Sequence, residues 1–346
     1  MLEKRNKMKW SALICLLISV LFLFVLNILI GSVPISIRDM AHVFFGDASR
    51  MDKGIVTILL NYRLPQALVA LFSGAGLAVA GLLMQTLFRN PLADPSILGI
   101  SSGASLGVAS VILLFGSGTL LLQNWWTSLG ISVAAFIGAL LVLLLILSLS
   151  LRLKNIVSLL LIGIMIAFIT SSITDLLKFL SGKEELHSFV IWGMGSFSNV
   201  SQSQLPFFMI AILIGLLFSL FLSKSLNMIL LGDCYAENLG LNIHRSSLFI
   251  ILIAGYLTAL ITAYAGPIAF IGLSVPHMAR FLFKTSDHKI LIPACIILGM
   301  LLALFCNLIA RLPGFEGNLP INSVTSLIGA PFVIWIILKR QRIFQQ

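Results

Sequence analysis

Only a few side chains within the apolar stretches of this 346-residue chain could carry acid–base or metal chemistry. Asp94 could relay protons, but it lies in a proline-rich loop, and we favour a role in a rigid turn. Asp175 and Lys178 are three residues apart, a spacing that favours a local ion pair near a helix end. His277 has no second His, Cys or carboxylate at ligand spacing, so we expect it to bond a backbone carbonyl rather than a metal. This scarcity of titratable groups weakens any proton-coupled mechanism.

Sequence motifs for nucleotide, zinc or nucleophilic chemistry are absent. No Gly-x4-Gly-Lys-Ser/Thr loop is present to cradle phosphates, and no His-Glu-x-x-His pair is present to bind zinc. Cys15, Cys234, Cys295 and Cys306 lack the spacing of metal ligands, and three of them fall in apolar runs as small fillers. We therefore expect no catalytic residue, no metal and no bound cofactor, and any ATP would have to be hydrolysed by another chain.

A polar island at Gly232–Asn242 interrupts two long apolar runs. Its composition predicts a short helix: Asp233 can cap the start, Ala236 and Leu239 would share a face, and Gly240 suits the C-terminal turn. Such an element, held outside the membrane, could receive force or a signal from a soluble partner. The residues that we assign to it are Gly232, Asp233, Ala236, Glu237, Leu239 and Gly240.

The elements that must position these residues lie in a membrane. The chain is 59% hydrophobic and 10% charged, with a mean hydropathy of +1.09, whereas soluble domains carry about 25% charged residues. Several apolar runs approach or exceed the roughly 20 residues that cross a bilayer as a helix, and the alternation of a β-barrel is not visible. The sequence predicts an all-α polytopic protein with about ten crossings, at 10–30, 66–88, 96–115, 129–150, 156–179, 205–223, 247–265, 267–283, 290–310 and 324–338.

Basic residues predict the orientation of these helices. With ten crossings, fifteen of the 22 Lys and Arg residues fall at the termini or in loops on one side, which is then the cytoplasm. Both termini and a segment of about 225–246 around the polar island are predicted to be cytoplasmic. The first apolar run is too long for a signal peptide, so we expect it to be retained. The net charge of +10 reflects this topology rather than a nucleic-acid partner.

Three outer segments, at about 31–65, 181–204 and 311–324, are longer than simple turns. The second contains Trp192 and could form a short helix at the headgroup level. Together the three segments could dock a partner, or they could be plain connectors.

Small residues follow a four-residue spacing on two helices. We expect Gly99, Gly103 and Gly107 to lie on one face of the third helix, as Gly74 and Ala78 do on the second, with Gly81 nearby. Close helix packing is the favoured interpretation, and the alternative is a small face that lines a changing cavity. The hydroxyl residues that could line such a path are Ser101, Ser102 and Ser105.

Short strings along nearly the whole chain match one family together and in order. They are Arg63-Leu-Pro65, Gly74-Ala75, Gln85-Thr86, Arg89-Asn-Pro-Leu-Ala93, Leu98-Gly99, Gly103-Ala104, Gly232–Gly240, Gly266-Pro-Ile-Ala-Phe-Ile-Gly-Leu273, Pro276-His277, Arg280, Asp287-His288, Ala310-Arg311 and Gly329-Ala-Pro-Phe332. Each string is weak alone, but jointly they are very specific. The chain resembles the FecCD family of ABC importer permeases, which carry iron-siderophores, haem or vitamin B12.

The resemblance implies a single permease domain over 1–346, with ten helices and the type II ABC importer fold, in the bacterial cytoplasmic (inner) membrane. It implies a homodimer, two cytoplasmic ATPase subunits that bind ATP and Mg, and a periplasmic or lipid-anchored substrate-binding protein. Gly232–Gly240 matches the family's ATPase-coupling element. Arg63 and Arg311 match arginines that dock the binding protein.

Four positions depart from the family pattern. Gln66 stands where a second docking arginine is common, and Asn307 stands where an acidic residue is common. The usual Glu-x-Pro-x-Gly before the last helix reads Asn318-Leu-Pro-Ile-Asn322, with Glu316 displaced. The docking surface and the outer gate are therefore expected to differ from the commonest pattern.

The function that we expect is the inward movement of an iron chelate, either a siderophore or haem, by alternating access. Vitamin B12 (cobalamin) is the alternative cargo within the same family. A secondary transporter without an ATPase would need titratable groups at mid-membrane, and an intramembrane enzyme would need a catalytic pair. Titratable groups in the apolar runs are scarce, and no catalytic pair is found in the sequence.

Overall fold

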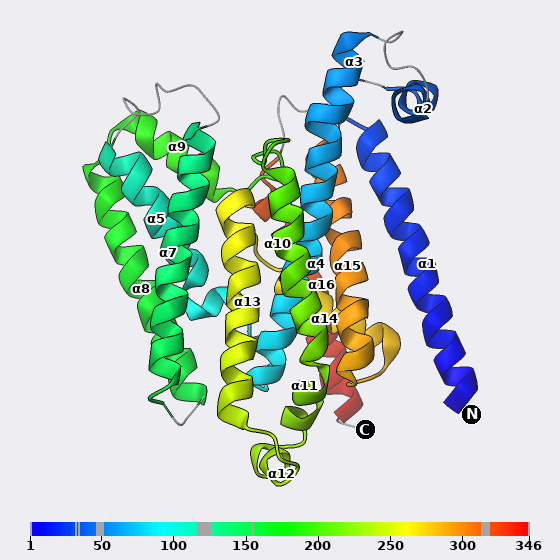
Figure 1. The fold of residues 1–346 in the computed structure, drawn as a ribbon, viewed down its shortest axis with the longest axis vertical. Helices are drawn as coiled ribbons and strands as arrows, with labels where there is room; N and C mark the ends of the chain where they lie inside the picture. The colour runs from blue at the N-terminus through cyan, green and yellow to red at the C-terminus, as the bar shows by residue number, and fades with distance from the viewer. Residues whose placement is uncertain are drawn as a thin grey trace.

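The computed structural model describes residues 2–31, 33, 35–45, 52–115, 126–153, 156–312 and 319–344. Within these ranges every regular element is a helix, and no strand occurs (Figure 1). This confirms the predicted all-α, polytopic architecture. The elements are α1 (Leu2–Leu29), α2 (Ile37–Phe45), α3 (Lys53–Thr57), the π-helix η2 (Ile58–Arg63), α4 (Leu64–Leu87), the 3-10 helix η3 (Pro95–Leu98), α5 (Ile100–Phe115), α7 (Trp126–Ser150), α8 (Ile156–Leu180), α9 (Lys183–Gly193), α10 (Leu205–Phe221), α11 (Ser223–Leu230), α12 (Asp233–Asn238), α13 (Ile243–Ala265), α14 (Ile271–Phe283), α15 (His288–Ala310) and α16 (Ile321–Phe344).

Each of the ten predicted crossings is occupied by a helix. In the described parts of the chain, six helical stretches are long and apolar enough to span a membrane: Ser11–Leu29, Lys53–Leu87, Leu129–Ser150, Val157–Leu180, Ile243–Ala265 and His288–Ala310. Helices α10 and α11 meet at a bend of 49° and form a seventh span if the pair is counted as one. Helices α5 and α16 contain shorter apolar stretches, Ile100–Leu113 and Ile321–Ile336.

Helix α14 is shorter than the predicted eighth crossing. Gly266 ends α13 with a φ of +75°, a conformation that suits glycine, so the predicted Gly-Pro break is present. The chain stays non-helical until Phe270, and α14 therefore has 13 residues. At 1.5 Å per residue that is about 20 Å, compared with roughly 30 Å for the core of a bilayer. The helical part of this predicted crossing is therefore shorter than the core of a bilayer.

Helix α4 is the centre of the fold. Nearly all of its side chains are buried, and it packs against α10, α13, α14 and α15. Two glycines allow these close approaches: a Cβ on Gly74 would lie 2.2 Å from the carbonyl oxygen of Gly299, and one on Gly81 would lie 1.8 Å from that of Gly272. The predicted packing role of the small residues on this helix is confirmed.

A second group of helices, α5 with α7, α8 and α9, joins this centre mainly through the contact of α7 with α13 (Figure 1). Helices α5 and α7 cross where Gly103 and Gly107 meet Gly138; a Cβ on Gly107 would lie 2.2 Å from the carbonyl oxygen of Ala134. Gly99 does not share their face. It precedes α5 with a φ of +79°, ends η3, and lies against α8 instead.

The two ends of the bundle differ. Both termini lie at the same end as α12, and α2, α3 and α9 lie at the opposite end (Figure 1). We call these the α12 end and the α9 end. The arrangement agrees with an even number of crossings, and assignment of the α12 end to the cytoplasm remains a prediction.

Candidate functional site

The predicted short helix in the polar island is present as α12, and its C-terminus is closed as expected. The amide of Gly240 donates to the carbonyl of Glu237 (2.8 Å), and the amide of Leu241 donates to that of Ala236 (3.0 Å). This Schellman pattern requires a left-handed residue, and Gly240 has a φ of +85°.

The start and the faces of α12 differ from the sequence prediction. Gly232, with a φ of +108°, occupies the N-cap and makes no side-chain cap, while Asp233 lies in the first turn. Ala236 is fully buried but Leu239 is 55% exposed, so the two do not share a face. The reason is that this helix has six residues, and Leu239 already belongs to its terminal turn.

Apolar side chains point away from the bundle along this element. Leu231, Tyr235 and Leu239 are each more than half exposed, although they lie beyond the long apolar helices. Cys234 and Glu237 are exposed on the same short helix. Exposed apolar groups with a polar surround are typical of a surface that binds another protein.

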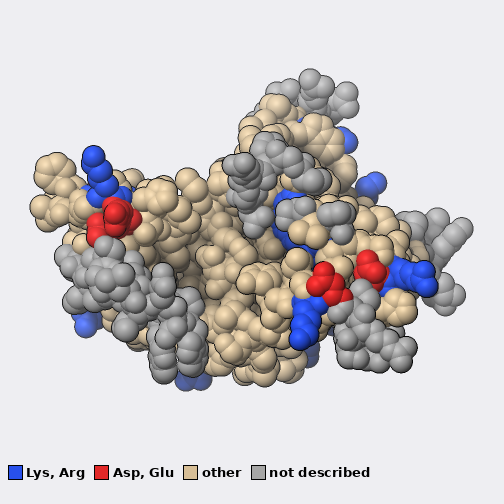
Figure 2. All heavy atoms as spheres, turned by 90° about the horizontal axis from the view of Figure 1, so that it is seen from above, with Lys and Arg blue, Asp and Glu red and all other residues tan. Residues whose placement is uncertain are grey.

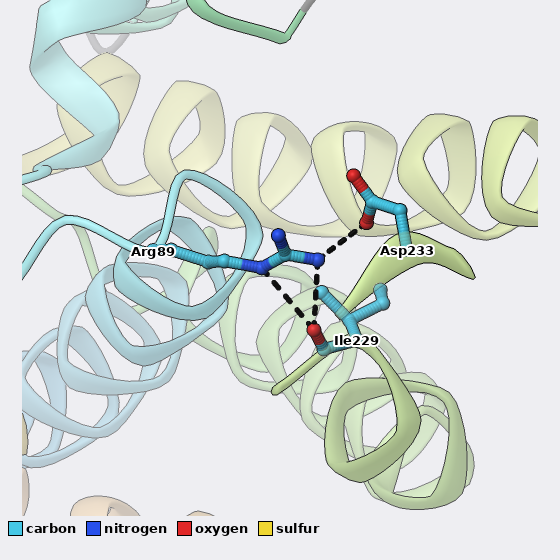
Figure 3. A network of polar contacts seen from close by, with 3 residues as sticks. All are labelled: Arg89, Ile229 and Asp233. Carbon is cyan, nitrogen blue, oxygen red and sulfur yellow. Dashed lines mark hydrogen bonds and ion pairs between the residues drawn. The ribbon is translucent and has the colours of Figure 1, made fainter. Parts of the chain in front are cut away.

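Arg89 links α12 to the end of α4 (Figure 3). Its Nε and Nη2 atoms donate to the carbonyl oxygen of Ile229 at 3.2 and 2.9 Å, and Nη2 also forms an ion pair with Asp233. Ile229 belongs to α11 and Asp233 opens α12. One guanidinium therefore bonds residues on both sides of Gly232, which is the joint between α11 and α12.

The backbone of Arg89 adopts an unusual conformation for its residue type. The amide of Arg89 donates to the carbonyl of Thr86, and the amide of Asn90 donates to that of Gln85, both at 3.2 Å. This is the Schellman pattern again, and it places Arg89 at the left-handed position with a φ of +47°. Glycine is the usual residue there, and another side chain costs about 1–2 kcal/mol.

A second polar link joins α11 to α4 and α15. The Oδ1 atom of Asn227 lies 2.9 Å from the amide of His288 and 2.8 Å from its Nδ1, and Asn227 Nδ2 donates to Asp287 (2.7 Å). On its other side, His288 Nε2 lies 2.8 Å from the hydroxyl of Thr86. Asn227 lies 61 residues from its partner His288, so no local sequence motif connects the two.

A cavity of about 800 Å³ lies between α12 and the ends of the membrane helices. Its walls come from the ends of α4, α7, α8, α11 and α13, and they include Arg89, Asp233, Glu237 and His244. Part of the space beside α12 is therefore open, while the burial of Ala236 and the ion pair of Asp233 with Arg89 attach the helix to the bundle.

At the α9 end, the two arginines expected to dock a partner both donate hydrogen bonds to carbonyls at the end of α1. Arg63 is only 2% exposed, and its guanidinium donates to the carbonyls of Ile28 (2.9 Å), Leu29 (2.7 Å) and Val33. Arg311 donates to the carbonyl of Asn27 at 3.2 Å. Cations at the C-terminus of a helix satisfy its last carbonyls and favour its dipole. Both arginines lie at the end of the bundle opposite α12, as predicted. The burial of Arg63 was not predicted.

Exposed charge at this end lies elsewhere. Viewed from the α9 end, acidic and basic side chains gather over α9 on one side and over α2 and α3 on the other (Figure 2). A basic patch lies between them among mostly uncharged residues (Figure 2). The groups over α9, α2 and α3 belong to the predicted outer segments 31–65 and 181–204. Residues 313–318 of the third segment, which include Glu316 and Asn318, lie outside the described residues. Asn322 accepts a hydrogen bond from the amide of Ala269 (3.0 Å).

Gln66 does not reach the outer surface either. It is buried in a chain of side-chain amides, in which Gln66 Nε2 donates to Asn307 Oδ1 (3.1 Å) and Asn307 Nδ2 donates to Asn27 Oδ1 (2.8 Å). Asn27 completes the chain by donating to the carbonyls of Leu23 and Leu304. Two of the departures from the family pattern are therefore direct partners, which sequence distance alone could not reveal.

The predicted hydroxyl residues lie near a small cavity. Ser102 and Ser105 line a space of about 200 Å³ together with Ser171, Thr174 and Lys178. Ser101 is not among the residues described as lining it, and its carbonyl accepts a hydrogen bond from Ser105 (3.1 Å). Lys178 pairs with Asp175 at 3.0 Å, which confirms the local ion pair.

The remaining chemical candidates have structural partners. His277 Nε2 lies 2.8 Å from the carbonyl of Pro91, as expected for a histidine that bonds the backbone. Asp94 caps η3 through the amide and hydroxyl of Ser96, which fits the rigid-turn interpretation. Among the residues that the structure describes, no group of three His, Cys, Asp or Glu side chains could hold a metal ion.

Comparison with known proteins gives one consistent family. The model of the FecCD transport family matches residues 17–339. The vitamin B12 import system permease proteins BtuC of Shigella boydii serotype 18 and of Escherichia coli are each 34% identical over 340 residues, which is 98% of this chain and 98% of each relative. A solved structure of a metal-chelate type ABC transporter in an inward-facing conformation superposes with a TM-score of 0.83 and 29% identity. The match covers 95% of this chain and 99% of that one.

Proposed function

This chain belongs to the FecCD transport family of ABC importer permeases, and on that premise we propose that it carries a metal chelate inward by alternating access, driven by ATP hydrolysis on separate subunits. The observation that carries the coupling part of this proposal is the attachment of α12. This helix presents apolar side chains outward and is tied by Arg89 to α4. It therefore connects a surface suited to a partner with the central helix of the permease.

The route of coupling runs through two links. A displacement of α12 by an ATPase subunit would pull on Arg89 through Asp233, and on Asn227 through α11. The first pull reaches the end of α4, and the second reaches α15 and α4 through His288. Both helices lie in the best-packed part of the fold, where small shifts are transmitted rather than absorbed.

The proposed path for the cargo includes the hydroxyl-lined cavity between α5 and α8. Ser102, Ser105, Ser171 and Thr174 offer weak, neutral hydrogen-bonding groups. A large chelate must pass without being held, and such groups suit that need, while the one charged side chain that lines this cavity, Lys178, is paired with Asp175. Gly103 and Gly107 instead set how closely α5 approaches α7, so we assign them to packing.

Docking of a substrate-binding protein is proposed at the α9 end. Burial and the neighbouring Arg63 lower the pKa of Arg311 to about 10. A carboxylate of a docked protein would relieve this repulsion between two cations, so Arg311 remains our candidate for docking, and Arg63 would support it from within. The exposed charges of α9 and α2 offer further contacts around them.

The assembly that we propose contains two copies of this chain, two ATPase subunits and one binding protein in the bacterial inner membrane. An iron-siderophore or haem is the proposed cargo. Cobalamin is the alternative, because relatives that are 34% identical are named for vitamin B12 import.

Uptake into liposomes tests this proposal. The complete importer, with its own ATPase and binding protein, should take up one of ferric siderophore, haem or cobalamin in the presence of ATP. Replacement of Arg89 by Ala should lower the uptake per ATP hydrolysed without dissociating the ATPase. Uptake that continues without ATP and collapses with an ionophore would instead identify a secondary transporter.

A further inference from the structure

A basic groove lies at the α12 end, away from α12 itself, where the end of α14 meets α16. It encloses about 390 Å³ and is lined by His277, Arg280, Phe281, Lys284, Thr285, Ser286, Ile336 and Lys339. We propose that this basic groove binds the headgroup of an acidic phospholipid.

The first argument is charge. Arg280, Lys284 and Lys339 bring three cations to one space, and none of the described side chains that line it is acidic. No hydrogen bond or ion pair is described for the ammonium of Lys284, which is exposed. Thr285 and Ser286 add hydroxyl donors beside it. This combination matches a phosphodiester, which carries one negative charge and several acceptor oxygens.

The second argument is that one of the cations is already held in place. The Nζ atom of Lys339 lies 4.9 Å from the ring centroids of both Phe281 and Trp335. Contact with two aromatic faces restrains the ammonium and directs at most two of its three N–H groups toward the rings. At least one donor remains available to a ligand, and little side-chain entropy is lost when it binds.

The third argument concerns the surface beside the groove. Trp335 and Phe281 are each 47% exposed, and Leu338 and Leu282 are at least half exposed on the same two helices. Cations next to exposed aromatic and aliphatic side chains are typical of the boundary between headgroups and acyl chains. A free anion would use the cations alone, whereas a phospholipid would also cover these apolar side chains. The surroundings therefore favour a lipid.

Quenching of Trp335 by brominated lipids tests the inference directly. The full-length chain is placed in bilayers of phosphatidylcholine to which brominated phosphatidylglycerol or brominated phosphatidylcholine is added. The Trp335 signal is obtained as the difference from Trp335→Phe, which keeps an aromatic ring. We expect stronger quenching by the anionic lipid. The combined change Lys284→Gln and Lys339→Gln should weaken its apparent affinity by about fivefold for each lysine.

Lys224→Gln is the matched control, because it removes an exposed lysine at the same end but outside the groove. It should leave the preference for the anionic lipid unchanged, and thermal unfolding should show that all variants are folded. Equal quenching by the two lipids would overturn the inference. So would removal of the preference by inorganic phosphate, which would identify a site for a soluble anion. Loss of subunit assembly in the lysine variants with lipid preference intact would identify a protein contact instead.

Discussion

At the scale of single residues, Arg89 combines an unfavourable backbone with a useful side chain. A left-handed φ at the C-terminus of a helix is ordinarily left to glycine. Here an arginine occupies it, and its guanidinium reaches both α11 and α12. Backbone strain of this kind persists where surrounding contacts hold it in place, and it is common at functional sites. The function that we infer for Arg89 is the link between α12 and α4.

Arg89→Gly separates these two effects. Glycine relieves about 1–2 kcal/mol of backbone strain, and the change removes a half-exposed ion pair and the hydrogen bonds to Ile229, which together contribute a similar amount. We therefore expect thermal stability to be nearly unchanged. Uptake per ATP hydrolysed should fall several-fold, because α12 loses its tie to α4. Asp233→Asn is the milder control, since Arg89 can still donate to Ile229. A coupling ratio for Arg89→Gly equal to that of wild type would contradict the inferred role.

Gln66 and Asn307 form a neutral pair where the family commonly has an arginine and an acid. Because both are buried and hydrogen-bonded to each other, we infer that the two departures compensate one another. Gln66→Arg alone would bury an unpaired charge and cost about 3–5 kcal/mol. Gln66→Arg together with Asn307→Asp should recover much of that loss in thermal unfolding. A double variant no more stable than Gln66→Arg would show that the positions are independent.

At the scale of elements, α12 depends on its last turn. Gly240 has nothing within 4 Å of the position of a Cβ, so a side chain there would meet no clash, only an unfavourable φ. Gly240→Val should therefore fray α12 while the membrane helices stay intact. We expect weaker binding of the ATPase subunit, measured by co-purification. Gly193→Val, at an equally open position with an ordinary φ, should bind normally.

The elements also show what sequence could and could not predict. Long apolar runs gave the right helices, because each must satisfy its own backbone in lipid. The late start of α14 and the separation of Gly99 from α5 were missed, since both depend on left-handed residues that pattern alone does not locate. The burial of Arg63 was missed because its acceptors are the last carbonyls of α1. The hydrogen bonds of Asn227 and Asn27 were also not predicted, because their partners His288 and Asn307 lie far away in the chain.

At the scale of the whole molecule, sidedness can be tested with a native cysteine. Cys15 and Cys234 are exposed, whereas Cys295 and Cys306 are buried. In a Cys15→Ser background, a membrane-impermeant maleimide should label Cys234 in inside-out vesicles and not in right-side-out vesicles. Added ATPase subunit should protect it. Asn199→Cys, at the α9 end, is expected to label with the opposite sidedness. Labelling of Cys234 from the outside would overturn the predicted orientation.

The joint at Gly232 has a mechanical consequence for the whole molecule. A single guanidinium contacts the chain before and after this glycine, so the joint is braced against free rotation. The same arginine ends α4, the helix with the most complete burial. A force applied at α12 would therefore act first on α4, at the centre of the fold. The central helices would move first, and the lipid-facing helices would follow last.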